Sequence, residues 1–174
     1  ADTNGVVNDC HSNGIDLVVV GPEAPLVAGI ADALASAGIA CFGPSQAAAQ
    51  LEGSKSFTRA FAESCGIPSP ASKTFTSTDD AIAWFDEQPF DVVVKADGLA
   101  AGKGVSVAMD EAQAIAAVDD IMLDKVFGAA GASVVIEEFM DGEEASFFIL
   151  SDGTSVLPIG TAQDHKRAYD GDEG

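Results

Sequence analysis

The spacing of two short apolar segments near the start of the chain constrains the fold most. Ile15–Val20 and Ile39–Phe42 are rich in β-branched residues, and each runs into a glycine- and proline-containing break, at Gly21–Pro25 and Gly43–Ser45. Between them, Leu26–Ala37 carries apolar residues at helical spacing and ends before a glycine. Strand, helix and strand at this spacing predict a βαβ unit with a parallel sheet, whose first strand is buried on both faces.

The breaks after the two strands are the expected functional edge of this sheet. Ligands of open α/β sheets bind beyond the carboxyl ends of the strands, so 21–25 and 43–45 are placed to meet one. Ser45 can cap a helix that covers 47–50, and a further helix is expected from Ser54 to Ser64. The segment Gly66–Pro70 reads as a linker and a domain boundary.

The remainder of the chain has the pattern of an α+β unit built on antiparallel hairpins. Ser77 or Thr78 can cap a helix anchored by apolar side chains, and a second helix is expected at 110–123. The predicted strands are 91–95, 105–108, 134–139 and 145–150, with Asp141-Gly142 turning the chain between the last two and Asp152-Gly153 turning it again.

Net charge excludes some partners. The formal charge is −20, from 28 acidic and 8 basic side chains, so nucleic acid and anionic membrane surfaces are poor partners. An acidic surface alone explains most of this charge. An acidic protein that binds a polyphosphate must still gather its few cations around the ligand, because charges beyond about 8 Å are screened. The positions of the basic residues are therefore informative.

The three cysteines, Cys10, Cys41 and Cys65, form no CxxC pair and are expected to be small core residues in a reducing compartment. No signal peptide and no apolar run of about 18 residues is evident, which favours a cytoplasmic protein. The chain starts without Met and ends in an acidic, turn-like stretch, so a fragment of a longer protein is expected.

The central motif is the glycine-rich segment Lys95–Gly104. Gly98, Gly102 and Gly104 allow the backbone to approach phosphate oxygens, and Lys95 and Lys103 add point charges. The spacing is not that of a Walker P-loop, and a strand rather than a helix follows. The segment predicts a hairpin flap over phosphates, with an ordinary tight hairpin as the alternative.

Three further motifs carry charge. Lys55, in Gln50–Lys55, is either a ligand contact or a solvated helix lysine. Glu137–Ser146 holds four carboxylates on two adjoining strand ends, which could serve an adenine edge and a ribose, hold magnesium, or form an acidic surface. Gln163–Arg167 is either an anion site or a patch that balances the acidic tail.

The cations are not scattered. Five of the eight basic residues fall inside these motifs: Lys55, Lys95, Lys103, Lys166 and Arg167. This placement predicts a polyphosphate site, and by itself it names no reaction.

Five segments, in order, resemble glycinamide ribonucleotide synthetases, the phosphoribosylamine–glycine ligases of the ATP-grasp superfamily. They are VVVGPEAPLVAGI, CFGPSQAAAQLEGSK, VVKADGLAAGKGVSVA, VVIEEFMDGEEASFFIL and AQDHKR. The resemblance covers nearly the whole chain. It implies that 1–50 is the later half of a Rossmann-like domain, 51–70 a connecting helix and linker, 71–138 an ATP-grasp lid, and 139–174 the start of the central ATP-grasp domain.

The resemblance also implies roles for particular residues. Lys55, Lys95 and the 98–104 loop, with Lys103, would meet the phosphates of ATP. The adenine would lie against Glu137, Glu138, Phe139 and Met140, and Glu144 would hold the ribose. Catalytic work would fall to Lys103, His165, Lys166 and Arg167, while Pro22, Glu23, Asp164 and Lys166 would lie on the substrate side.

The reaction implied by the resemblance joins glycine to 5-phosphoribosylamine through glycyl phosphate, with ATP converted to ADP and phosphate. Mg²⁺, or Mn²⁺, is the implied metal, and its ligands would lie after residue 174, so the chain alone is expected to be inactive. Two alternatives stay open: another ATP-grasp carboxylase or ligase, which would need bicarbonate rather than glycine, and a nucleotide-binding module without catalysis. The sequence does not indicate an oligomeric state.

Overall fold

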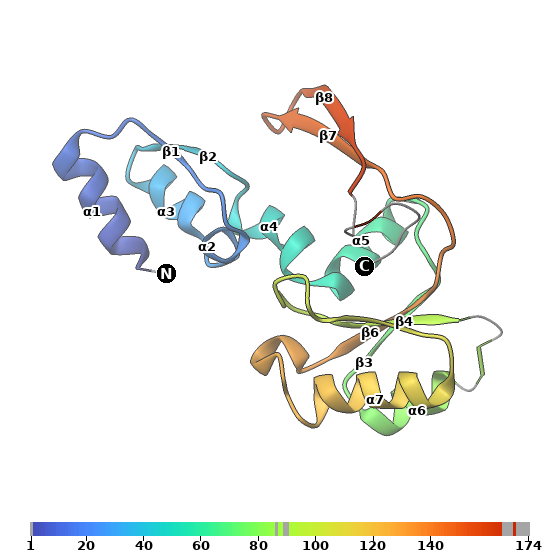
Figure 1. Cartoon of the computed structure of the whole chain (residues 1–174). Coiled ribbons are helices and arrows are strands. Elements are labelled where there is room, and N and C mark those ends of the chain that lie inside the picture. Colours follow the sequence, from blue (N-terminus) through green and yellow to red (C-terminus); the bar gives the residue numbers. More distant parts are fainter. Residues whose placement is uncertain (1, 86, 89–90, 165–168, 170–174) are drawn as a thin grey trace. The chain divides into compact units, whose positions relative to one another are not determined.

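The computed structural model describes residues 2–85, 87–88, 91–164 and 169 of the chain. The chain is a mixed α/β protein and divides into two compact units, Ala1–Phe139 and Met140–Gly174 (Figure 1). Within the described residues, every helix is too short or too polar to cross a lipid bilayer.

The first unit begins with the predicted βαβ arrangement. Its elements are α1 (Thr3–Asn13), β1 (Leu17–Val19), α2 (Glu23–Val27), α3 (Ile30–Ser36) and β2 (Ala40–Phe42). Strands β1 and β2 pair in parallel, with Leu17 opposite Ala40, which confirms the predicted parallel sheet. Because the strands are parallel, the loops that follow them lie at the same edge, and Val20 donates its N–H to the Phe42 carbonyl there.

Two details of this region differ from the prediction. The single helix expected over 26–37 is wrong, because the chain forms α2 and α3 on either side of Gly29, whose φ of +90° breaks the helix. The expectation that the first strand is buried on both faces is also wrong. Val18 packs against the core of α1–α3, whereas Leu17 and Val19 are 56% and 66% exposed, because helices cover only one side of these strands.

Two capped helices lead out of this region. Helix α4 (Gln46–Gly53) begins at Ser45, whose hydroxyl accepts the Ala48 N–H as predicted. Helix α5 (Lys55–Ser64) begins directly afterwards at Ser54, whose hydroxyl accepts the Phe57 N–H. The cap at Ser54 fixes the direction in which the first turn of α5 points.

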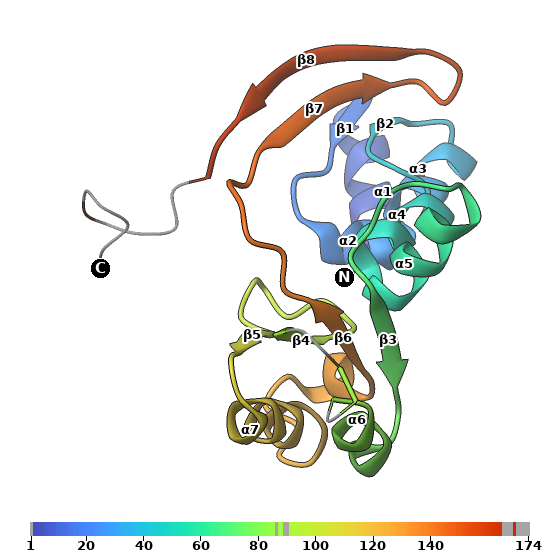
Figure 2. The ribbon, with the colours of Figure 1, turned by 90° about the vertical axis from the view of Figure 1, so that its right-hand side faces the viewer.

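The rest of the first unit is an antiparallel sheet covered on one face by two helices. Its elements are β3 (Ser72–Phe75), α6 (Thr78–Phe85), β4 (Val92–Ala96), β5 (Val105–Ala108), α7 (Glu111–Met122), a 3₁₀ turn (Gly128–Gly131) and β6 (Val134–Glu138). The strand order is β3-β6-β4-β5, and α6 and α7 lie side by side beneath the sheet (Figure 2). Ser77 caps α6, as one of the two predicted alternatives.

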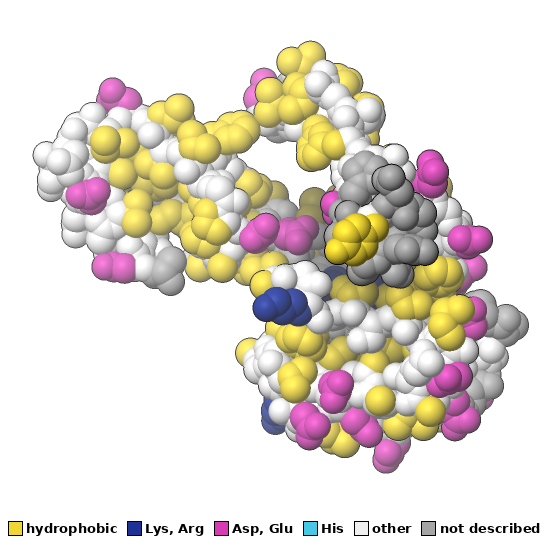
Figure 3. Space-filling model, in the orientation of Figure 1, with side chains coloured by type: hydrophobic (Ala, Val, Ile, Leu, Met, Phe, Trp, Pro, Cys, Tyr) yellow, Lys and Arg dark blue, Asp and Glu magenta, His cyan; other side chains and the backbone are white. Residues whose placement is uncertain are grey.

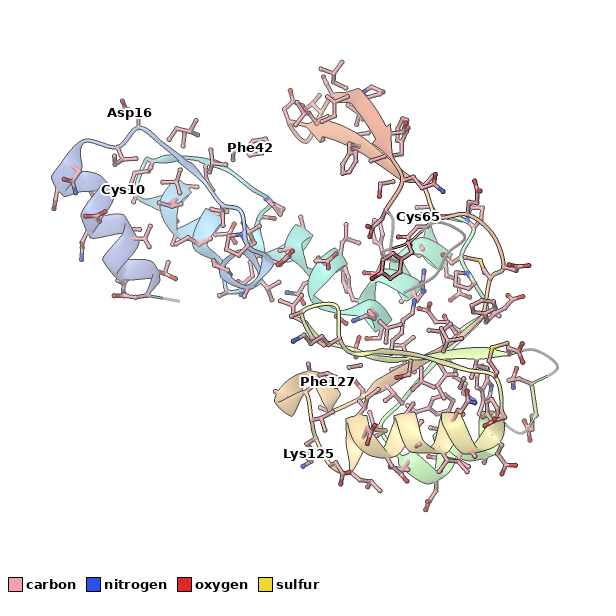
Figure 4. The ribbon with its side chains drawn as sticks, in the orientation of Figure 1. Cys10, Asp16, Phe42, Cys65, Lys125 and Phe127 are labelled. Carbon is pink, nitrogen blue, oxygen red and sulfur yellow. The ribbon has the colours of Figure 1, made fainter. Side chains whose placement is uncertain are left out.

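The core lies between this sheet and its two helices. Alternate residues of β4 and β6, including Val92, Val94 and Ile136, point into it, and the rings of Phe75 and Trp84 meet at 5.6 Å between centroids. Phe127 packs against this core, whereas the neighbouring Lys125 is exposed (Figure 4). The opposite face of the sheet carries the other alternate residues, which include Val93 and Val135 together with Lys95 and Glu137.

The second unit, taken by itself, is an antiparallel hairpin of β7 (Ser146–Ser151) and β8 (Val156–Ala162). The expected hairpin across Asp141-Gly142 is wrong, because β6 pairs with β3 and β4 while β7 pairs with β8. The carboxylates of 137–138 and 143–144 therefore do not face each other across a hairpin. Apolar side chains dominate the visible surface of the β7–β8 hairpin (Figure 3).

The cysteines only partly match their prediction. All three are free; Cys10 is buried and Cys41 is half-buried, as expected of small core residues. Cys65, at the end of α5, is exposed, so its assignment to the core is wrong. It follows the last residue of the helix, where the chain leaves the packed surface.

Candidate functional site

The alternation of β4 and β6 places two opposite charges on the uncovered face of the sheet. Val92, Val94 and Ala96 point into the core, so Lys95 points the other way. In the same manner Ile136 points inward and Glu137 outward. The register sets Val93 opposite Glu137 and Lys95 opposite Val135, so Lys95 and Glu137 are diagonal neighbours on one face.

Helix α5 brings two further cations to this face. Lys55 is its first residue and Arg59 lies four positions later, so the two share one side of the helix. Arg59 donates to both carboxylate oxygens of Glu137, at 2.7 and 2.9 Å. The sequence motifs did not include Arg59, although its spacing from Lys55 was the available signal.

Glu137 joins the helix to the sheet. Its carboxylate also accepts from Lys95 Nζ at 2.6 Å, and the residue is only 2% exposed. Burial acts to raise the pKa of Glu137, but the hydrogen bonds and charges of Arg59 and Lys95 outweigh it and hold this pKa below its ordinary value. Glu137 is therefore an ionised carboxylate between two cations.

The ammonium of Lys55 is held by main-chain oxygens. Lys55 Nζ donates to the carbonyls of Ala96, Asp97 and Gly98, at 2.7, 3.4 and 3.2 Å. Burial is the main cause that lowers the pKa of Lys55, and the nearby Lys95 charge adds to it. The Lys55 ammonium therefore lies against the last residue of β4 and the first two residues of the glycine-rich loop.

These side chains surround a pocket of about 180 Å³. It is lined by Leu51, Glu52, Lys55, Thr58, Arg59, Lys95 and Glu137. Three cations against two carboxylates give the lining a net positive charge, which suits an anion. Lys55 and Lys95 line this pocket together, and their contact with phosphate stays a prediction.

A larger hollow of about 610 Å³ lies between α5 and β3. Arg59 and Lys73 bring its positive charge, and Glu63 offsets part of it. The Arg59 guanidinium, which is bound to Glu137, lines both this hollow and the 180 Å³ pocket.

Asp97 lies within the glycine-rich motif and, like Arg59, is given no role by the sequence alone. Its carboxylate accepts from the Ser56 N–H and from the hydroxyls of Ser54, Ser56 and Ser133. Burial acts to raise the pKa of Asp97, and the hydrogen bonds from the Ser56 N–H and the serine hydroxyls outweigh it and lower this pKa. Asp97 therefore joins the loop after β4 to the beginning of α5.

Close packing and backbone conformation, apart from any ligand, require glycine at three positions of the 98–104 loop. A Cβ at Gly98 would lie 2.9 Å from Ala130 Cα, and one at Gly104 would lie 2.7 Å from Ala100 Cβ. Gly102 has a φ of +72° and open space around it. The Gly98 N–H already donates to the Ala130 carbonyl. Lys103 is exposed and is not among the residues that line the 180 Å³ pocket, so its contact with phosphate stays a prediction.

Gly98→Ala should destabilise the chain by about 1–3 kcal/mol, because the new methyl group meets backbone that cannot easily move. Urea unfolding at neutral pH measures the loss. Gly21→Ala is the matched control, since a Cβ there meets nothing within 4 Å and its φ is not left-handed. Equal unfolding free energies for Gly98→Ala and the unaltered chain would contradict the close packing.

The end of β6 and the residue after it are hydrogen-bonded to the residues that precede β3 and β4. The Glu138 N–H donates to the Ala71 carbonyl, and the Glu138 carboxylate accepts the Ala71 N–H at 3.3 Å. The Phe139 N–H donates to the Asp91 carbonyl. These two amides are therefore already used within the protein, and the predicted adenine contact of Glu137–Met140 stays a prediction.

The other predicted residues are spread along the chain. Pro22 and Glu23 are exposed at the start of α2, on the loop edge after β1. Met140, Glu144 and Asp164 are exposed in the second unit, and their placement against the first-unit pocket stays a prediction. His165, Lys166 and Arg167 lie outside the described residues. No three His, Cys, Asp or Glu side chains are grouped to hold a metal ion in the part of the chain that is described.

Lowering the pH should weaken the contacts that Glu137 and Asp97 make with α5. The pKa values of Glu137 and Asp97 lie below their ordinary 4.5 and 3.8, so both carboxylates stabilise the fold at neutral pH. This contribution is complete above the unfolded-state values and is lost as pH falls from about 5 through the lowered folded values. Unfolding free energies measured from pH 7 to pH 3 should fall less steeply for Glu137→Gln than for the unaltered chain. Parallel curves would contradict the assignment.

Comparison with known proteins identifies the family of the chain. Residues 1–52 match the N domain of phosphoribosylglycinamide synthetase, and residues 53–174 match the ATP-grasp (A) domain of the same family. A phosphoribosylamine–glycine ligase of Rhizobium meliloti is 59% identical over 97% of this chain and 40% of its own length. The chloroplastic ligase of Arabidopsis thaliana is 52% identical over the whole chain and 33% of its own length. The chain thus spans well under half of these relatives.

Solved structures share the fold. The phosphoribosylamine–glycine ligase of Thermotoga maritima is 29% identical, with a TM-score of 0.70 over 77% of this chain and 34% of its own. A biotin carboxylase domain from Hydrogenobacter thermophilus is only 17% identical, with a TM-score of 0.78 over 92% of this chain and 36% of its own, and shows the fold alone. On the two family matches, which together run from residue 1 to residue 174, this chain belongs to the phosphoribosylglycinamide synthetase family.

Proposed function

We propose that the protein containing this chain uses ATP to join glycine to 5-phosphoribosylamine, which gives glycinamide ribonucleotide, ADP and phosphate. The observation that carries the proposal is the convergence of Lys55, Arg59 and Lys95 on one pocket in a chain with 28 acidic residues. Relatives 52–59% identical along nearly the whole chain carry the name of this ligase and support the choice of substrates.

The donor set of the pocket fits a phosphate chain. Lys55 and Lys95 are point charges that can meet phosphate oxygens without a fixed angle. The glycine-rich loop begins after Ala96, the last residue of β4, so bound phosphates would lie close to it. ATP supplies the phosphoryl group that activates the glycine carboxylate for attack by the ribosylamine nitrogen.

The residues of this chain would act mainly by position and charge. Phosphoryl transfer needs little covalent chemistry from the protein, so lysines that neutralise the transferring group and hold it in line do most of the work. Closure of the 98–104 loop would exclude water from the activated glycine. The described residues supply no metal site, and the ligands of Mg²⁺ stay a prediction for sequence beyond residue 174.

The test is ADP release by the full-length protein in the presence of glycine and 5-phosphoribosylamine. Turnover should need both substrates, and replacing glycine with bicarbonate should abolish it. Bicarbonate-dependent turnover would instead indicate an ATP-grasp carboxylase. Saturable ATP binding without turnover would indicate a non-catalytic module. The 174-residue chain alone should release no ADP in the same assay.

A further inference from the structure

The contacts of Asp97 bear on how the pocket is assembled. Asp97 follows the last residue of β4, and its carboxylate reaches two other parts of the first unit. One oxygen accepts the Ser56 N–H at 2.8 Å and the Ser54 hydroxyl at 3.1 Å, both at the start of α5. The other accepts the Ser56 hydroxyl at 2.9 Å and the Ser133 hydroxyl, just before β6, at 3.1 Å. One carboxylate therefore joins the ends of three elements.

The same residue also contacts Lys55 through its backbone. The Lys55 N–H donates to the Asp97 carbonyl at 3.1 Å, and Lys55 Nζ reaches the carbonyls of Ala96, Asp97 and Gly98. The Asp97 N–H donates to the Ser133 carbonyl. The direction of the Lys55 side chain thus depends on a turn that the Asp97 carboxylate holds against the first turn of α5.

We infer that Asp97 is a positioning residue for ATP binding, which acts by aiming the Lys55 ammonium into the pocket shared with Lys95. Asp97 is absent from the pocket lining, so it acts through Lys55 rather than on the ligand. A carboxylate suits this task because it can accept four hydrogen bonds at once, whereas an amide has one accepting oxygen. This inference rests on the proposed function, since the effect is read in ATP affinity.

The experiment uses the full-length protein and measures the dissociation constant of MgATP, the KM of glycine and the free energy of unfolding. Asp97→Asn should raise the dissociation constant of MgATP by about tenfold, because the amide nitrogen cannot accept the two hydrogen bonds made by one of the carboxylate oxygens. The KM of glycine should stay within about twofold. Ser133→Ala, which removes one of the four hydrogen bonds, should give a smaller increase of about threefold and keeps the test open if Asp97→Asn fails to fold.

Two comparisons separate positioning from a general loss of stability. Asp110→Asn is the matched control, because Asp110 caps α7 through the Gln113 N–H and Nε2 and is not part of the pocket. It should destabilise the fold while leaving MgATP affinity unchanged. In a Lys55→Met background, Asp97→Asn should cause almost no further loss of affinity, since the group it aims is gone.

Each result bears on a different claim. Unchanged MgATP affinity in a folded Asp97→Asn protein overturns the inference, as does an effect that is fully additive with Lys55→Met. An equal loss of affinity in Asp110→Asn also overturns it. Failure of the unaltered protein to bind MgATP would instead contradict the proposed function. Failure of the inference and failure of the proposed function are therefore distinguishable.

Discussion

Replacing Glu137 with alanine is expected to destabilise the chain by about 3 kcal/mol, the largest loss we predict for a single substitution. Glu137 is 2% exposed and is held by Arg59 at 2.7 Å and Lys95 at 2.6 Å. Its removal leaves two half-buried cations facing each other without the carboxylate that compensates them, and breaking a buried pair costs several times more than breaking an exposed one. Urea unfolding at pH 7 measures the difference.

Two variants test the physical cause of this loss. Glu138→Ala alters the next residue, whose carboxylate makes one weak contact to Ala71, and should cost less than about 1 kcal/mol. Lys95→Met should be less harmful in the Glu137→Ala background than in the unaltered chain, because the repulsion between cations is then relieved. Additive losses would show that the three charges do not act together.

Replacing Lys55 with methionine in the full-length protein is expected to weaken ATP binding by about tenfold to a hundredfold. Methionine keeps much of the apolar stem and removes the ammonium, so the expected loss is that of one charge-assisted hydrogen bond to a phosphate. Lys95→Met should have an effect of similar size, with an additional loss of stability through Glu137. Calorimetric titration with MgATP measures both.

Controls come from the remaining lysines. Lys73, over the Phe75 ring at 5.3 Å, and Lys125, exposed after α7, do not line the 180 Å³ pocket. Methionine at either should leave ATP affinity unchanged. Lys103→Met separates two forms of the proposal: a loss of affinity would support closure of the glycine-rich loop over phosphates, and no loss would limit binding to Lys55 and Lys95. Equal losses at Lys55, Lys73 and Lys125 would mean that only overall charge matters.

Local pattern predicts much of this fold. The apolar runs and glycine breaks locate β1 and β2, and Ser45 and Ser77 act as the caps that their positions indicate. The pattern fails where distant packing or a single dihedral decides the outcome. Gly29 splits an otherwise continuous helical pattern, and β6 enters the sheet between β3 and β4 rather than folding back on the next strand. No feature close to β6 in the sequence indicates those partners.

Some residues of the candidate site can likewise be predicted from local sequence, and others cannot. Lys55, Lys95 and Glu137 stand out in the sequence because cations and clustered carboxylates are conspicuous in their motifs. Arg59 does not, because its partner Glu137 lies 78 residues away and only the tertiary fold brings them together. Asp97 is inconspicuous in so acidic a chain, and its serine partners lie 36 to 43 residues away. Helical spacing from Lys55 could have identified Arg59, whereas nothing local could have identified the partners of Asp97.

The contacts between α5 and the sheet also limit where this part of the molecule can bend. Helix α5 precedes the segment 66–70 and is fixed to the sheet through Arg59 and Glu137. Ala71 follows the segment and is fixed to the same strand through Glu138. A stretch whose two ends are anchored to one strand cannot act as a pivot, however many prolines and glycines it contains. Rotation of the sheet relative to β1 and β2 must therefore carry α5 with it, and its hinge lies outside the segment 66–70.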